Sequence, residues 1–176
     1  MAADFGIYFR EADFPSFDEW QAACQNRSPR IRLYPVDLRT HSGTLPAVSE
    51  GTEFNFQFEF QISHHWRGLD TIFDGESALF AHFRCFAAEW EATAHAALAF
   101  MSISDGVFSD PFGAEYHTFD YALRYVQDSL KTKWQRLASD PSQKLAAIKA
   151  YQSENNTGIA DAKAVIEAYL RNSQGT

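Results

Sequence analysis

Lysine is absent from the first 130 residues of this 176-residue chain, although that segment contains eight arginines. The same segment contains nineteen aspartates and glutamates, so its formal charge is −11, whereas residues 131–176 carry a formal charge of +3. Such a surplus of negative charge repels nucleic acid and can steer a basic protein into contact. We therefore expect no nucleic-acid binding by the acidic segment and favour a basic protein as its partner.

Cysteine is also scarce, and long apolar runs are missing. The two cysteines, Cys24 and Cys85, lie far apart, so we expect reduced, buried thiols instead of a disulfide framework. No stretch of 18 apolar residues is present, which predicts that no segment spans a membrane. The residues that follow Met1 lack the basic leader and apolar run of a secretory signal. Together these features predict a cytoplasmic location and no membrane partner.

Sequence motifs of common catalytic sites are missing as well. The chain contains no Gly-x-Ser-x-Gly, no Gly-x-Gly-x-x-Gly and no Gly-Lys-Ser/Thr loop, so no cofactor is predicted and a non-catalytic protein is favoured. Glu89 and Glu91, or Glu91 with His95 one helical turn later, are the candidates for acid–base chemistry if they line a cleft.

Three histidines suggest an alternative function. His64 and His65 follow a Phe-rich strand, and neighbouring strand residues point to opposite faces, so they cannot share a metal ion without a bend. His82 and Cys85 would supply only two ligands, so no metal site is predicted. In the alternative, His64, His65 and His82 line an aromatic pocket that binds a small ligand or supports hydrolysis.

Residues 1–138 are predicted to form an α+β body. Aromatic residues make up 15% of the chain and can fill one substantial core. In residues 54–62, phenylalanine and isoleucine alternate with polar residues, which is typical of a strand with one buried face. We therefore expect an antiparallel sheet of four to six strands with helices covering one face.

Other segments of the body follow the same kinds of pattern. Strands are predicted over residues 5–9, 30–34 and 79–86, and helices over 17–25, opened by a Ser16-x-x-Glu19 capping box, and 89–101. Residues 40–51 are rich in turn formers. Apolar residues at helical spacing from Phe119 to Leu137 predict one helix of about twenty residues.

Residues 139–176 are predicted to form a C-terminal helical hairpin, packed on or appended to the body within a single domain overall. Asp140-Pro141 is a typical helix start, and the segment 155–158 is a turn between two helices. The hairpin resembles that of the C-terminal domain of the bacterial ribosomal stalk protein, without a gap, at seven positions between residues 144 and 167: Lys144, Ile148, Lys149, Gly158, Ala162, Lys163 and Glu167.

This resemblance implies a docking surface for translation factors. In the stalk protein family, hairpin lysines and an exposed aliphatic residue contact translational GTPases, and the matching positions in this chain are Lys144, Ile148, Lys149, Ile159 and Lys163. The family domain also has strands on both sides of the hairpin, whereas a helix is predicted before it here.

A second resemblance concerns the run from Gly106 to Pro111 after the Ala-rich helix, which is similar to segments of small bacterial immunity-type proteins. We favour a bacterial protein–protein interaction module, of immunity or regulatory type, whose acidic body binds a basic partner. The alternatives are the ligand-binding or hydrolytic pocket and the docking of a translation factor.

Overall fold

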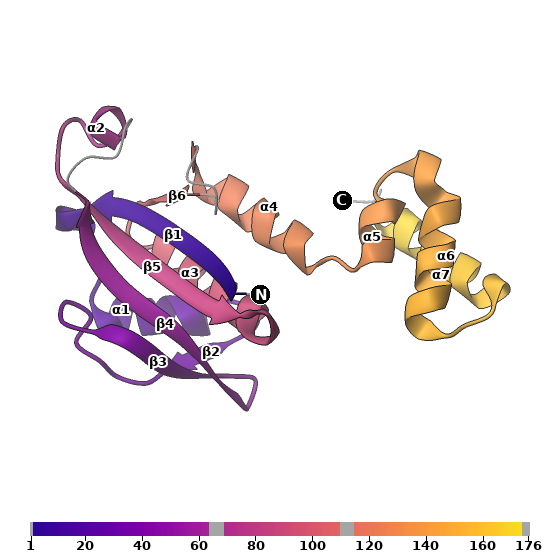
Figure 1. The fold of residues 1–176 in the computed structure, drawn as a ribbon, viewed down its shortest axis with the longest axis horizontal. Coiled ribbons are helices and arrows are strands. Elements are labelled where there is room, and N and C mark those ends of the chain that lie inside the picture. Colours follow the sequence, from indigo (N-terminus) through magenta and orange to yellow (C-terminus); the bar gives the residue numbers. More distant parts are fainter. Residues whose placement is uncertain (1, 64–68, 110–114, 174–176) are drawn as a thin grey trace. The chain divides into compact units, whose positions relative to one another are not determined.

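The computed structural model describes residues 2–63, 69–109 and 115–173, which belong to two compact units. Unit 1 is Met1–Val126, and unit 2 is Gln127–Thr176. The predicted α+β class is confirmed, with an antiparallel sheet in unit 1 and a helical hairpin in unit 2 (Figure 1). None of the helices in the described ranges has the length and apolar character needed to cross a membrane.

A sheet of seven strands forms the centre of unit 1, in the order β2-β3-β4-β5-β1-β6-β7, and every neighbouring pair is antiparallel. This exceeds the predicted four to six strands. The strands are β1 (Ala2–Arg10), β2 (Ile31–Leu33), β3 (Ser42–Ser49), β4 (Thr52–Ser63), β5 (Ala78–Phe86), β6 (Val107–Ser109) and β7 (Tyr116–His117).

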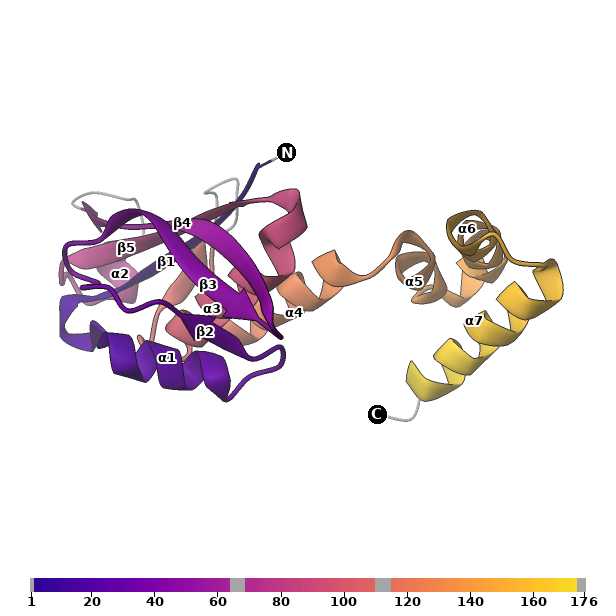
Figure 2. The same ribbon diagram turned by 90° about the horizontal axis from the view of Figure 1, so that it is seen from below.

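One face of the sheet carries the core and is covered by α1 (Phe17–Gln25) and α3 (Trp90–Met101) (Figure 2). Phe56 and Phe58 of β4 and Phe83 of β5 point to this face and are at most 2% exposed. The Trp20 ring of α1 contacts all three, with ring centroids 4.8–6.3 Å apart. The predicted alternation of β4 is therefore confirmed, since Asn55 and Gln57, between these phenylalanines, are exposed on the opposite face.

Among the residues that the structure describes, the other face of the sheet is covered at one end only. There the short helix α2 (Leu69–Ile72) and the following Phe73 pack against Tyr8 and Ala78 in a small second cluster. The described ranges also contain three single-turn 3-10 helices: η1 (Glu11–Asp13), η2 (Ala87–Glu89) and η3 (Pro141–Gln143).

The helices predicted over residues 17–25 and 89–101 are confirmed as α1 and α3. At the start of α1, the Ser16 side chain accepts a hydrogen bond from the Glu19 N–H while the Glu19 carboxylate accepts one from the Ser16 N–H. This reciprocal capping box satisfies two main-chain donors that the first helical turn leaves unpaired.

Although residues 40–51 are rich in turn formers, β3 occupies most of this segment. Leu45 and Ala47 are buried at alternate positions and supply the strand periodicity. Pro46 is tolerated since its main-chain oxygen accepts from the Tyr34 N–H, one residue after β2 ends. In a strand, the main-chain N and O atoms of one residue point to the same side. The nitrogen of Pro46, which has no hydrogen to donate, therefore faces Tyr34 just beyond the end of β2, so no hydrogen bond between β2 and β3 is lost.

The single long helix predicted from Phe119 to Leu137 is also wrong. Instead, α4 (Phe119–Leu130) ends and α5 (Lys133–Ala138) begins, with Thr132 as its N-cap. The Thr132 hydroxyl accepts from the Gln135 N–H, and the Gln135 side chain accepts from the Thr132 N–H. This second capping box starts a new helix although the apolar spacing continues across the break.

Unit 2 is a small three-helix unit formed by α5, α6 (Lys144–Asn155) and α7 (Ile159–Ser173). The division between the units lies before the predicted boundary at residue 138, because Ala138 of α5 is buried with Ile148 of α6 and Ile166 of α7. Asn156, with a φ of 51°, makes the left-handed turn between α6 and α7.

Candidate functional site

Four charged or titratable side chains meet on the uncovered face of the sheet, where β4, β5 and β1 lie side by side. The register aligns Glu59 with His82 and Arg84 with Asp4. Asp4 Oδ1 lies 3.1 Å from His82 Nε2 and accepts a hydrogen bond from Arg84 Nε at 2.8 Å. On the other side, Glu59 Oε1 lies 3.4 Å from His82 Nδ1.

This arrangement occupies both nitrogens of the His82 ring with carboxylates. A histidine that acts as a general base needs one ring nitrogen directed at the group that gives up the proton. Here the Asp4 and Glu59 carboxylates lie at the two ring nitrogens, so His82 connects three strands of the sheet. The hydrogen bond that Arg84 donates to the Asp4 carboxylate raises the pKa of Arg84, which stays cationic.

Beside this cluster, the sheet opens into a hollow because β4 and β5 do not end together. Residues Gln57–Ser63 of β4 pair with β5, whereas residues 52–56 pair with β3 alone. After Phe86 the chain leaves β5 and turns into η2, on the way to α3. The hollow therefore follows from the length of β5 relative to β4.

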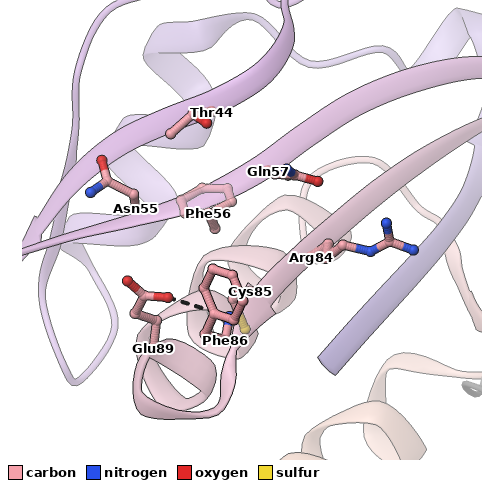
Figure 3. Close-up of a pocket in the computed structure, with 8 residues that line it drawn as sticks. All are labelled: Thr44, Asn55, Phe56, Gln57, Arg84, Cys85, Phe86 and Glu89. Carbon is pink, nitrogen blue, oxygen red and sulfur yellow. Dashed lines mark hydrogen bonds between the residues drawn. The ribbon is translucent and has the colours of Figure 1, made fainter. Parts of the chain in front are cut away.

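This space, named the Phe86 hollow here, has a volume of about 250 Å³. Figure 3 shows its lining, which combines an aromatic ring with amide, hydroxyl and charged groups. The lining residues are Thr44, Asn55, Phe56, Gln57, Arg84, Cys85, Phe86 and Glu89.

Two of these side chains are set up for contact with a ligand. The Phe86 side chain is 74% exposed, whereas the other phenylalanines that the structure describes are buried or half-buried. Glu89 Oε2 accepts a hydrogen bond from the Phe86 N–H at 3.3 Å, which holds the carboxylate close to the aromatic ring (Figure 3). The hollow therefore offers an apolar face and a negative charge together.

A second hollow, of about 320 Å³, shares Glu89 with the first and is more acidic. Glu50, from the β3–β4 turn, and Glu91, from the first turn of α3, also line this acidic hollow. Glu89 and Glu91 thus do line a concave surface, as their acid–base hypothesis requires. The three carboxylates give this surface a negative charge, which attracts a positively charged partner.

A third hollow, of about 520 Å³, has the opposite character. It lies at the edge strand β2 and is lined by Arg30 and Arg32, together with polar residues and Glu50. Two guanidinium groups make this hollow unsuitable for a basic ligand.

The thiols and the remaining histidine of α3 are poorly placed for catalysis. Burial raises the pKa of Cys24 to about 12, and burial also raises the pKa of Cys85. Burial lowers the pKa of His95, which favours its neutral form. Thiolate is the nucleophilic form of cysteine, so Cys24 and Cys85 are poor nucleophiles near neutral pH.

The predicted docking residues of unit 2 differ in their accessibility. Ile148 is 7% exposed and belongs to the core of the unit. Lys144 Nζ donates to Glu167 Oε1 at 2.8 Å and so joins α6 to α7. Lys149, Ile159 and Lys163 are exposed and remain open to a partner.

Within the described residues, the structure does not bring the three predicted pocket histidines together. His64 and His65 lie outside the described residues, and His82 does not line any of the three hollows. Phe86 was missed, although a signal existed: the alternation through β5 places it on the same face as His82 and Arg84, away from the core.

No protein-family model, no curated protein and no solved structure significantly matches this chain.

Proposed function

We propose that the protein is a non-catalytic binding module whose acidic unit 1 engages a basic segment of another protein, in a regulatory or immunity-type role. The observation that carries this proposal is the acidic hollow, where Glu50, Glu89 and Glu91 converge from separate elements. Their charges add to those of a segment that contains no lysine and has a formal charge of −11 over residues 1–130. Charge of one sign speeds the encounter with an oppositely charged partner and disfavours wrong partners.

The chemistry of the described side chains supports binding more than catalysis. Cys24 and Cys85 are buried and have raised pKa values, and the His82 ring is engaged by carboxylates on both sides. The Glu89 carboxylate in turn is held by a main-chain N–H beside an exposed aromatic ring, a combination typical of a recognition surface.

The experiment compares two triple variants of equal net charge. In the first, the substitutions Glu50→Gln, Glu89→Gln and Glu91→Gln neutralise the acidic hollow. In the control, Glu11→Gln, Asp18→Asn and Glu115→Gln neutralise exposed carboxylates elsewhere in unit 1. Partner proteins are first cross-linked to the full-length protein in cells of its source organism and identified. Each partner is then purified, and its affinity is measured at about 50 and about 300 mM salt.

We expect a basic partner whose affinity falls at the higher salt concentration and falls roughly tenfold or more in the first variant. The control variant should weaken binding about threefold at most, since rim charges contribute little. Equal losses in the two variants, or affinity that does not respond to salt, would contradict the proposal.

A second candidate function rests on the exposed side chains of unit 2. Lys149, Ile159 and Lys163 are accessible and correspond to the docking positions of the ribosomal stalk protein. If the hairpin docks a translation factor, the substitutions Lys149→Glu and Lys163→Glu will abolish binding to a purified translational GTPase. Lys133→Glu with Arg171→Glu changes the net charge of unit 2 equally and should leave that binding intact.

A further inference from the structure

The Phe86 hollow presents three properties that together select one kind of side chain. It has an accessible aromatic face, a fixed carboxylate and several neutral oxygen acceptors. Among the phenylalanines that the structure describes, only Phe86 is exposed. Its ring is therefore available to a ligand, while the other described rings are buried or half-buried.

We propose that the Phe86 hollow receives an arginine side chain from an extended basic segment of the partner protein, with the guanidinium over the Phe86 ring and paired with Glu89. This inference rests on the proposed function and names the side chain that the site recognises. The guanidinium is planar and weakly hydrated, so it stacks on aromatic faces better than the compact ammonium of lysine.

The dimensions and the acceptors fit this occupant. Within the chain itself, the Arg39 guanidinium lies 4.3 Å from the centroid of the Phe14 ring, which shows the contact distance to expect. A guanidinium has five N–H donors, and Glu89 can accept only some of them. The hydroxyl of Thr44 and the amide oxygens of Asn55 and Gln57 line the same hollow and can accept the others.

Arg84 also lines the hollow and carries the same charge as the proposed occupant, but it is directed elsewhere. Its Nε donates to Asp4 Oδ1 on β1 at 2.8 Å. Figure 3 shows the Arg84 side chain extending away from Phe86 and Glu89, which lie together at the other side of the hollow. The Asp4 carboxylate thus holds and offsets this charge.

The acidic hollow adjoins the Phe86 hollow, so an extended segment of a partner could occupy both. Because Glu89 borders both spaces, a chain that places one arginine on Phe86 can place a neighbouring basic side chain near Glu50 and Glu91. Alternate residues of an extended segment point to the same side, so a basic-x-basic spacing suits the two hollows.

The test uses the full-length protein and the synthetic peptide acetyl-Gly-Arg-Gly-Arg-Gly-amide, followed by amide NMR shifts at low salt. The matched control peptide contains citrulline in place of arginine, which keeps the shape and removes the charge. Phe86→Leu retains apolar bulk and removes the aromatic ring, and Glu89→Gln keeps an oxygen for the Phe86 N–H. Tyr34→Ala and Glu11→Gln alter an exposed aromatic and an exposed carboxylate outside the hollow.

We expect the arginine peptide to shift amides around Phe86 and Glu89, and the citrulline peptide to bind roughly tenfold more weakly. Phe86→Leu and Glu89→Gln should each weaken the arginine peptide about fivefold, and the two outside variants should have no effect. Unchanged affinity in both hollow variants, or shifts confined to other surfaces, would overturn this inference and leave the proposed function standing. A wild-type protein that binds neither peptide at low salt would count against both.

Discussion

The indole Nε1 of Trp20 donates a hydrogen bond to the main-chain oxygen of Ala96, with 2.9 Å between the two atoms. Trp20 is fully buried, and this bond joins α1 to α3 across the core beneath the sheet. The position of α3 matters for the candidate site because the acidic hollow includes Glu91 from its first turn.

The substitution Trp20→Phe should therefore destabilise unit 1 by about 2 kcal/mol, from the lost hydrogen bond and the space left by the smaller ring. Urea unfolding followed by far-ultraviolet circular dichroism measures this change without relying on tryptophan fluorescence. Trp134→Phe, in unit 2, provides the comparison. A Trp20→Phe protein as stable as the wild type would show that the bond contributes nothing.

His95, which is half-buried in α3, gives unit 1 a dependence on pH whose sign can be derived. Burial depresses the pKa of His95 in the folded protein below its ordinary value of 6.5, the nearby Glu91 opposes this shift, and Arg27 adds to it. As the pH falls below about 6.5, the unfolded chain takes up the proton first. The contribution of the neutral ring is thus complete above this pH and is lost as the pH falls toward the folded value.

Wild-type protein should accordingly lose stability between pH 7.5 and pH 5.5 more steeply than a His95→Gln variant. Urea midpoints at several pH values provide the measurement. The slopes of unfolding midpoint against pH are compared between the wild type and the variant, and their difference reports on His95 alone. Parallel slopes would contradict the expectation.

The raised pKa values of Cys24 and Cys85 predict inert thiols in the folded protein. With Ellman's reagent at pH 8, we expect almost no release of the coloured product from native protein and two equivalents after unfolding in urea. Rapid labelling of Cys85 in the native state would show that the floor of the Phe86 hollow opens.

The Thr132 cap predicts a local effect on unit 2. Thr132→Ala removes the hydroxyl that accepts the Gln135 N–H, and N-cap losses of this kind cost about 1 kcal/mol. Thermal unfolding of the full chain should show a lower midpoint for unit 2. Thr132→Ser keeps the oxygen and should restore most of the stability.

How far the fold follows from the sequence depends on the range of the interactions involved. The alternation of phenylalanine through β4 and the capping box of Ser16 and Glu19 are local patterns, and both predicted their elements correctly. Strand β3 was missed because Pro46 is harmless only where β2 has already ended, which is a fact of pairing between distant residues. The break at Thr132 had a local signal, the spacing to Gln135, but the apolar stripe continued through it.

The candidate site was less predictable for the same reason. Glu89 and Glu91 were recognised as candidates if they lined a cleft, but whether they do depends on Glu50, which the β3–β4 turn brings to them. The Phe86 hollow exists because β5 stops while β4 continues, and strand lengths of this kind are set by the turn into η2. Exposure of Phe86 could be inferred only once β5 had been assigned as a strand.

The same alternation in β4 has a consequence for the unfolded chain. Residues 54–60 hold four phenylalanines at alternate positions, one carboxylate and no proline, so this segment can pair with copies of itself once it leaves the sheet. In the folded protein, pairing with β3 and β5 occupies most of this strand. Heating should therefore precipitate the full-length protein irreversibly as unit 1 opens, at a temperature that depends on the scan rate.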